Sequence, residues 1–448
     1  MSPTNAKKKR QMRTGSLALV FLLVYCGISS FILLRNGQVQ RESEFSVAAI
    51  SSFRELGSSA VNVSKLNKGF KETSVFGACL LVKDDNKILP EWLAYHYEVL
   101  PLRHLVLALD PYCITDPTPI LDAFRELGMT VEVWNADRYL DNKKFHPTPT
   151  ATDEEKFRTH VQRQSVFFGH CLEHLRDVAH SNNPLKWVLM VDSDEYVGFH
   201  TYEGPKSEVI PRNCRTFAPE QRQICTQHYN EAVQNGTHPR SHLPKVGEAT
   251  LASYIDSHEK VPATADMLAH DCIVLPRILI TSDNSTDQEL RNGVPEGFDP
   301  LSFWTLAYRD HGYLQNKFPG KSIVNVRKLT PNETIVVANA HRVLADRCKY
   351  GVYANAGESL FRIHHYVGSP QVFVSRPGDT HRTLAEFKKR NVRVAGCTDA
   401  YRGWLQAFVN RVGYDKAHAV TLGLRAWAFE TDAEISKKRE SNTTEVRL

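Results

Sequence analysis

The stretch VFGACLLVKDDNKILPEWLAYHYEVLPLRHLVLALD, residues 75–110, decides the fold. It contains an apolar run over 75–83, a helical pattern that opens at Pro90, and a second apolar run over 102–110. Short apolar runs bounded by turn residues are typical of buried strands, and proline is favoured in the first turn of a helix. A strand, a helix and a strand in succession predict a right-handed βαβ unit, and therefore a mostly parallel sheet.

The alternation of strands and helices continues along the chain. Residues 117–128 predict a helix ended by Gly128, and TVEVW over 130–134 predicts a third strand. A long helical pattern over 153–180 leads into the short apolar strand KWVLMVD. Further apolar runs occupy 272–280, 322–327, 334–339 and 361–367. We therefore expect an α/β domain with a Rossmann-like sheet flanked by helices.

Two segments depart from this alternation. Residues 200–262 are rich in Pro, Arg, His and Cys and lack an apolar period, so we expect an insertion or long loops there. After Arg376 the patterns over 402–413 and 417–429 are amphipathic and helical. The sequence therefore predicts a main domain over 75–375 and a helical C-terminal extension over 376–448.

The composition and the position of the charge exclude some classes of protein. The 448 residues are 42% hydrophobic and 23% charged, so the chain can bury a core. The formal charge of +5 comes from residues 1–13, which hold five Lys and Arg and no acid, leaving 50 basic against 50 acidic residues. A nucleic-acid-binding protein needs positive charge spread over its folded surface, so we expect no nucleic-acid partner.

An uncharged apolar segment follows the basic tail. Residues 14–34 run for 21 residues without a charge, roughly 31 Å as a helix, which is the thickness of a bilayer core. The segment is longer than the apolar core of a cleaved secretory signal, which is usually about 7 to 15 residues, and it lacks a small-residue cleavage site, so we expect an uncleaved signal-anchor helix. The cations of 1–13 keep that tail in the cytosol and place the rest in a lumen. The serine-rich residues 35–74 predict a flexible stem.

Two further features agree with a lumenal domain. Glycosylation sequons begin at Asn62, Asn235, Asn284, Asn332 and Asn442. Eight cysteines follow the apolar segment, at positions 79, 113, 171, 214, 225, 272, 348 and 397. An oxidising compartment permits disulfides among them, although 105 complete pairings are open. Cys214 and Cys225, which flank a polar segment, are the first pair to test.

Three carboxylates directly follow the strand KWVLMV. Asp192, Asp194 and Glu195 lie where ligands bind in open α/β sheets, at the carboxyl end of a strand. Crowded carboxylates repel one another unless a cation neutralises them, and Mg²⁺ or Mn²⁺ takes one or two while leaving positions for phosphate oxygens. A solvated turn that caps a helix is the alternative. The position after a buried strand favours the metal site.

The chain resembles glycosyltransferase family 92 and related GT-A-type glycosyltransferases. The resemblance lies in the stretches ACLLVKDDNKILPEWLAYHYEVLPLRHLVLALD (78–110), WVLMVDSDEYV (187–197), FPGKSIVNV (318–326) and RIHHYVGS (362–369). It implies a GT-A fold, a UDP-sugar donor such as UDP-galactose, Mn²⁺ (or Mg²⁺) on the Asp-x-Asp, inversion at the anomeric carbon, a glycan acceptor and a Golgi location. Residues 110–116 and 200–262 depart from the family's pattern.

The resemblance also implies roles for single residues. Asp194 would ligate the metal, Asp192 would bridge the metal or the ribose, and Glu195 would support them. Lys83, Glu91 and Asp110 would line the nucleotide pocket, where the alternative is helix capping and surface charge. Lys321 would contact the diphosphate. His364 and His365 are adjacent on a predicted strand and point to opposite faces, so one of them would reach the metal or a phosphate and the other would be a core residue.

An inverting transferase needs a general base for the acceptor hydroxyl. The candidates after the run 272–280 are Asp283, Asp287, Glu289 and Asp299. Asp283 is our choice, because it is nearest the end of the predicted strand.

Two other classes remain open. A lumenal binding module that has lost turnover would keep this fold, but the intact Asp-x-Asp argues against it. A Golgi sulfotransferase would need a Gly-rich Lys-Ser/Thr loop after its first strand, and none is present. The absence of GxSxG and HExxH argues against hydrolases of those types.

Overall fold

In the computed structural model, the residues that the structure describes all lie within Ala60–Leu448. The described residues are 75–140, 145–148, 150–181, 183–201, 214, 217–281, 291–308, 310–314, 320–337, 340–341, 343–344, 347–348, 359–368, 373–374, 382–390 and 401–445. The predicted tail, signal-anchor helix and stem lie outside them, and so does Asp283. Within these ranges, no helix is both long and apolar enough to cross a membrane.

The main sheet has six strands in the order β3-β2-β1-β4-β9-β6. Its parallel strands are β1 (Val75–Val82), β2 (Leu102–Leu109), β3 (Thr130–Trp134) and β4 (Leu185–Met190). The antiparallel additions are β9 (Ser322–Asn325), which pairs with β4, and β6 (Cys272–Val274), which pairs with β9. The predicted α/β fold with a mostly parallel sheet is confirmed.

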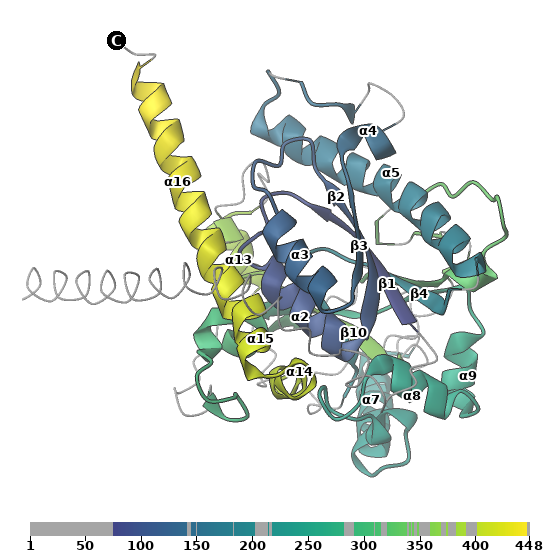
Figure 1. Cartoon of the computed structure of the whole chain (residues 1–448). Coiled ribbons are helices and arrows are strands. Elements are labelled where there is room, and N and C mark those ends of the chain that lie inside the picture. Colours follow the sequence, from purple (N-terminus) through teal and green to yellow (C-terminus); the bar gives the residue numbers. More distant parts are fainter. Residues whose placement is uncertain are drawn as a thin grey trace, which may run out of the picture. The chain divides into compact units, whose positions relative to one another are not determined.

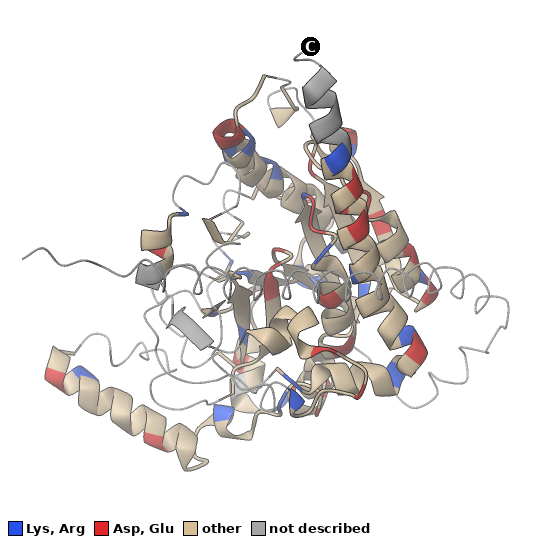
Figure 2. Cartoon of the chain, turned by 90° about the vertical axis from the view of Figure 1, so that its left-hand side faces the viewer, with Lys and Arg blue, Asp and Glu red and all other residues tan. Residues whose placement is uncertain are grey.

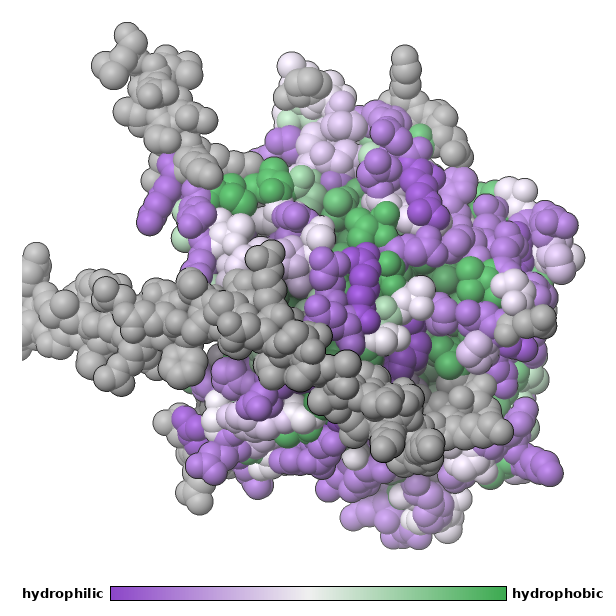
Figure 3. Space-filling view, in the orientation of Figure 1, coloured by the Kyte–Doolittle hydropathy of each residue, from purple (hydrophilic) through white to green (hydrophobic). Residues whose placement is uncertain are grey.

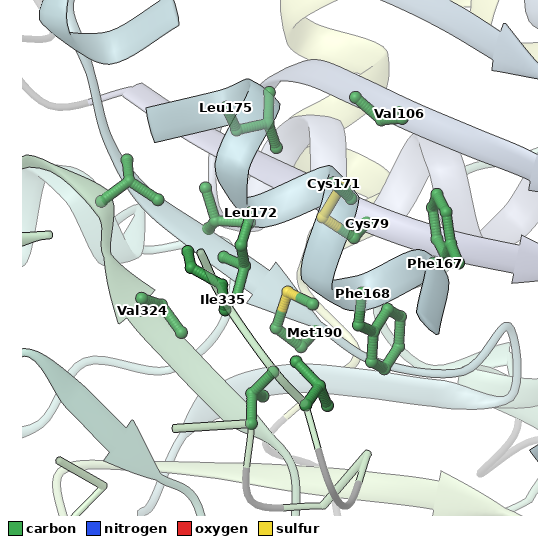
Figure 4. Close-up of a cluster of buried hydrophobic side chains, with 14 of the residues drawn as sticks. Cys79, Val106, Phe167, Phe168, Cys171, Leu172, Leu175, Met190, Val324 and Ile335 are labelled. Carbon is green, nitrogen blue, oxygen red and sulfur yellow. A yellow bond between two sulfur atoms is a disulfide. The ribbon is translucent and has the colours of Figure 1, made fainter. Parts of the chain in front are cut away.

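Helices cover both faces of this sheet (Figure 1). On one side lie α2 (Leu89–Val99) and α3 (Thr118–Glu126), and on the other lies α5 (Asp153–His180), after the short α4 (Ala136–Tyr139). Alternate side chains of the strands, among them Cys79, Val106 and Met190, pack against α5 (Figure 4). A disulfide between Cys79 and Cys171 joins β1 to α5 within this core.

The start of α5 is encoded locally. Thr152 accepts a hydrogen bond from the backbone N–H of Glu155, whose side chain accepts one from the backbone of Thr152, so the two form a capping box. Acidic residues fill the first turn, where they complement the positive end of the helix dipole.

The second sheet has the order β5-β10-β7-β8. Its strands are β5 (Glu195–Phe199), β10 (Phe361–Tyr366), β7 (Arg277–Thr281) and β8 (Asp310–Leu314). β10 is antiparallel to β5 and parallel to β7. α2 satisfies the edge of β5, because the side chains of Trp92, Tyr95 and His96 make hydrogen bonds to its backbone. All of α2 is buried, since it lies against both sheets and the C-terminal helices.

The described part of 200–262 is mostly helical, which differs from the predicted long loops. It contains α7 (Pro219–Gln234), η4 (Pro239–His242) and α8 (Leu251–His258), and α9 (Pro262–Leu268) follows. α7 buries only Asn230 and Val233, so its sequence carries little apolar period. The predicted disulfide between Cys214 and Cys225 is present and joins the segment before α7 to that helix.

The C-terminal region is helical, as predicted for 402–413 and 417–429. It contains α13 (Leu384–Arg390), α14 (Trp404–Val412), α15 (Tyr414–His418), the π-helical η7 (Ala419–Gly423) and α16 (Leu424–Glu445). α14 packs on α2, where Arg411 forms an ion pair with Glu98. Acidic and basic residues are interspersed along the described helices, α16 included (Figure 2). On the face in Figure 3, hydrophilic residues predominate and apolar residues form small patches.

The remaining described elements are short: η5 (Pro300–Ser302), α11 (Trp304–Ala307) and η6 (Val326–Lys328). Residues 334–337, part of a predicted strand, form no regular element. The backbone N–H of Ile335 donates instead to the side chain of Glu173 on α5.

Candidate functional site

The four residues from Asp192 to Glu195, here called the acidic turn, connect β4 of the first sheet to β5 of the second. The backbone N–H of Glu195 donates to Asp192 O at 3.1 Å, and the N–H of Asp192 donates to the Glu195 carboxylate at 3.1 Å. Tyr366, at the end of β10, donates its N–H to Asp194 O. The turn is therefore fixed between the ends of three strands.

Asp192 is the most exposed of the three carboxylates of the turn, with 36% of its side chain accessible to solvent. Its Oδ1 accepts a hydrogen bond from Gln164 Nε2 at 2.6 Å, and its Oδ2 lies 2.9 Å from Lys321 Nζ. β9 runs antiparallel to β4, so Lys321, directly before β9, lies where β4 ends. Burial acts to raise the pKa of Asp192, but the ammonium group of Lys321 outweighs it and lowers that pKa to about 2.

Lys321 is held in place by its backbone as well as by charge. A Cβ atom at Gly320 would lie 1.8 Å from Leu275 O, so only glycine fits immediately before this lysine. The side chain of Lys321 is buried. Burial acts to lower its pKa, but the carboxylates of Asp192 and Glu195 raise that pKa above its ordinary value. Lys321 is therefore a buried ammonium group paired with the acidic turn.

Glu195 has a fully buried side chain and faces several cationic or ionisable groups. Lys321 Nζ lies 3.7 Å, Arg277 Nη1 3.4 Å and His365 Nδ1 3.8 Å from its carboxylate oxygens. Burial raises the pKa of Glu195, and the positive charge of Lys321 opposes this shift. Asp192 and Glu195 are therefore paired with cations of the same chain.

The two adjacent histidines lie on opposite faces of β10, as predicted. His365 pairs with Glu195 across the sheet, and its Nε2 lies 3.3 Å from Asp194 Oδ2. His364 pairs with Tyr196 and stacks on Tyr401, with ring centroids 3.7 Å apart. His365 is thus the histidine next to the acidic turn, and His364 is a core residue.

Asp110 lies at the carboxyl end of β2 with its side chain fully buried. Its carboxylate accepts hydrogen bonds from Arg163 and from the backbone N–H of Tyr112, and it lies 2.7 Å from His160 Nδ1. Burial acts to raise the pKa of Asp110, but His160 and Arg163 lower it overall. Lys83 follows β1 and is partly buried, and its backbone N–H donates to the carboxylate of Asp85 at 3.2 Å.

Glu91 makes its hydrogen bonds to α11 and not to the acidic turn. Its carboxylate accepts hydrogen bonds from the N–H groups of Trp304 and Thr305 and from the Thr305 hydroxyl, so it caps α11. Burial raises the pKa of Glu91, and the Thr305 hydrogen bonds oppose the shift. Its contacts therefore match helix capping, which was the alternative to a role in the nucleotide pocket.

Sequence reasoning missed four residues. Gln164 on α5, Arg277 on β7 and His341 lie around the turn, and His160 on α5 lies beside Asp110. His341 Nδ1 lies 2.9 Å from Gly320 O, and burial followed by the charge of Lys321 lowers the pKa of His341 to about 4. In a single sequence, a polar residue on a long helix is interpreted as a surface residue. The spacing of 160 and 164 on one helical face was the only available signal.

The acidic turn offers a divalent metal few ligands. In the part of the chain that the structure describes, no group of three or more His, Cys, Asp and Glu side chains is arranged to hold a metal ion. Asp192 and Asp194 provide two carboxylates, which is the number that Mg²⁺ or Mn²⁺ takes when phosphates and water complete its shell. The residues fit that kind of site, provided that the cation shares Asp192 with Lys321.

No protein-family model and no curated protein matches the chain. Among solved structures, a crystal structure of S. aureus TarS, residues 1–349, is similar at 12% sequence identity. The likeness covers 80% of this chain and 91% of that one, with a TM-score of 0.23. This score is too low to show a shared fold.

Proposed function

We propose that the chain is a metal-dependent inverting glycosyltransferase that moves a sugar, galactose in the first instance, from a UDP-sugar to a glycan acceptor. One observation carries the proposal. Stretches that resemble glycosyltransferase family 92 lie far apart in the sequence but contribute neighbouring groups here: Asp192 and Asp194, Lys321, and His365. The fourth stretch forms β1, α2 and β2 beside them.

Asp192 and Asp194 would hold Mn²⁺ or Mg²⁺, which when bound supplies a Lewis acid for the departing diphosphate. Lys321 keeps Asp192 ionised at neutral pH, and Glu195 in turn holds Lys321 and His365 in place. Asp283 stays our proposed base for the acceptor hydroxyl. Lys83, at the end of β1, is placed to meet an anionic ligand at the same edge of the sheet.

We place the domain in the Golgi lumen, anchored by residues 14–34. Three disulfides support an oxidising compartment: Cys79–Cys171, Cys214–Cys225 and Cys272–Cys348. Two sequon asparagines, Asn235 and Asn332, are exposed and accessible to glycosylation.

A nucleotide-sugar-binding module without turnover is the second candidate. The observation that favours it is the pairing of Asp192 with both Gln164 and Lys321, which leaves that carboxylate less available to a metal.

The test is release of UDP by the full chain from a panel of UDP-sugars, with Mn²⁺ and with excess EDTA. We expect turnover only with the metal, and a loss of at least about 100-fold in Asp194→Ala, the scale of removing one transition-state electrostatic contact. Asp177→Ala, which changes a carboxylate 63% exposed on α5, is the matched control. Full activity of Asp194→Ala, or of wild type in EDTA, contradicts the metal assignment. Donor binding without any release of UDP supports the module instead.

A further inference from the structure

A second polar cluster lies next to the acidic turn, at the carboxyl end of β2. Its centre is Asp110, whose oxygens accept hydrogen bonds from Arg163 Nε at 3.0 Å and Nη2 at 2.8 Å and from Tyr112 N at 2.9 Å. The ring of His160 completes the set, with its Nδ1 2.7 Å from Asp110 Oδ2. Because all these donors come from the chain itself, a ligand can reach Asp110 only by displacing one of them.

His160 is the member of this cluster that faces outwards. Its side chain is 24% exposed, whereas those of Arg163 and Asp110 are buried. The Asp110 carboxylate holds the proton of the imidazole on Nδ1, which leaves Nε2 directed away from that carboxylate. Among the described residues, none makes a hydrogen bond to Nε2. The ring is therefore oriented by one nitrogen and available through the other.

α5 connects this histidine to the acidic turn. His160 and Gln164 are one turn apart on the same helical face, about 6 Å along the axis, and Gln164 is bonded to Asp192. β1 separates β2 from β4, so the two strands lie about 10 Å apart sideways, and β2 ends three residues further along β1 than β4 does. A nucleoside diphosphate is long enough to contact both Asp192 and His160.

The loop after β2 is packed against the same helix. Arg163 lies 5.1 Å and Lys156 5.8 Å from the centroid of the Tyr112 ring, which is within the range of cation–π contacts. Tyr112 also accepts a hydrogen bond from the backbone N–H of Thr148. These contacts hold the loop in place beside His160.

We propose that His160 contacts the uridine half of the donor, with Nε2 accepting a hydrogen bond from a ribose hydroxyl or from the imide N–H of the base, and with Asp110 and Arg163 as positioning residues. The proposal rests on the proposed function and changes one assignment within it. The nucleotide contact expected from Asp110 is made by the histidine that Asp110 orients.

The test is binding of UDP to the full chain with Mn²⁺, measured by titration calorimetry. His160→Asn keeps an amide that can donate to Asp110 but lacks an atom at the Nε2 position. We expect it to bind UDP about tenfold more weakly, the loss of one hydrogen bond, with an unchanged melting temperature. His170→Asn is the matched control, because His170 is a partly exposed histidine of the same helix that pairs only weakly with Glu173. It should bind UDP like wild type.

Uridine and pyrophosphate serve as separate probes. The variant should bind uridine more weakly and pyrophosphate like wild type, and a loss confined to pyrophosphate contradicts the proposal. Wild-type affinity for UDP in His160→Asn contradicts the proposal while leaving the proposed function intact. A wild-type chain that binds neither UDP nor pyrophosphate contradicts both.

Discussion

Replacing Lys321 by methionine removes the buried ammonium group between Asp192 and Glu195 while keeping an unbranched side chain. At an effective dielectric constant of about 20, the attractions over 2.9 Å and 3.7 Å are about 5.7 and about 4.5 kcal/mol. Most of this attraction is offset by the free-energy cost of removing the charges from water. Removing one partner of a buried ion pair lowers the free energy of unfolding by about 3–5 kcal/mol. We expect Lys321→Met to lower the free energy of unfolding by about 3 kcal/mol, the lower end of this range. Asp192 is 36% exposed and can be hydrated, and Glu195 keeps Arg277 as a partner.

The assay is urea unfolding of wild type, Lys321→Met, Glu195→Gln and the double variant at pH 7. If charge pairing rather than packing explains the loss of stability, the double-mutant cycle should show a coupling free energy of at least about 1 kcal/mol. The reason is that Glu195→Gln removes the carboxylate charge that Lys321→Met leaves without the lysine. Lys186→Met, at a partly buried lysine on β4, is the control for losing an ammonium group from this sheet. A Lys321→Met protein within about 0.5 kcal/mol of wild type, or a coupling near zero, would refute the reasoning.

Two further predictions concern stability. His96 accepts a hydrogen bond from the N–H of Val197, and burial lowers its pKa to about 3 in the folded chain. In the unfolded chain His96 is protonated below a pH of about 6.5, whereas in the folded chain it stays neutral down to a pH of about 3. As the pH is lowered from 6.5 to 3, His96 should therefore reduce the free energy of unfolding by up to about 1.4 kcal/mol per pH unit. We expect the free energy of unfolding of His96→Gln, measured by urea titration at pH 7, 6, 5 and 4, to depend less on pH than that of wild type. The same pH dependence in the two proteins would contradict this prediction. The Cys79–Cys171 disulfide spans 92 residues, so replacing both cysteines by alanine should cost about 4 kcal/mol in the same assay. A loss below about 1 kcal/mol would show that the constraint adds little.

The parallel part of the fold could be predicted because its strands and helices follow one another locally. The apolar runs over 75–83, 102–110 and 130–134 became neighbouring strands, as βαβ connections require. The run over 272–280 became two strands in different sheets, β6 and β7. Pro276 lies between them and cannot donate a backbone hydrogen bond, so one continuous strand is disfavoured there.

The site was predictable in part. The position of Asp192 and Asp194 at a strand end, and the opposite faces of His364 and His365, follow from the sequence. The pairing of Lys321 with Asp192 does not, because it depends on β9 running antiparallel to β4, and no local pattern encodes that direction. Glu91 shows the same limit, since its partners Trp304 and Thr305 lie more than 200 residues away.

The central claim is that the acidic turn supports metal-dependent transfer from a UDP-sugar. Its most direct test is the rate of UDP release from UDP-galactose and other UDP-sugars as Mn²⁺ is titrated into wild type and Asp194→Ala. We predict a rate in wild type that rises with Mn²⁺ and is abolished by EDTA, and no such rate in a folded Asp194→Ala protein. Equal, metal-independent rates in the two proteins would contradict the account.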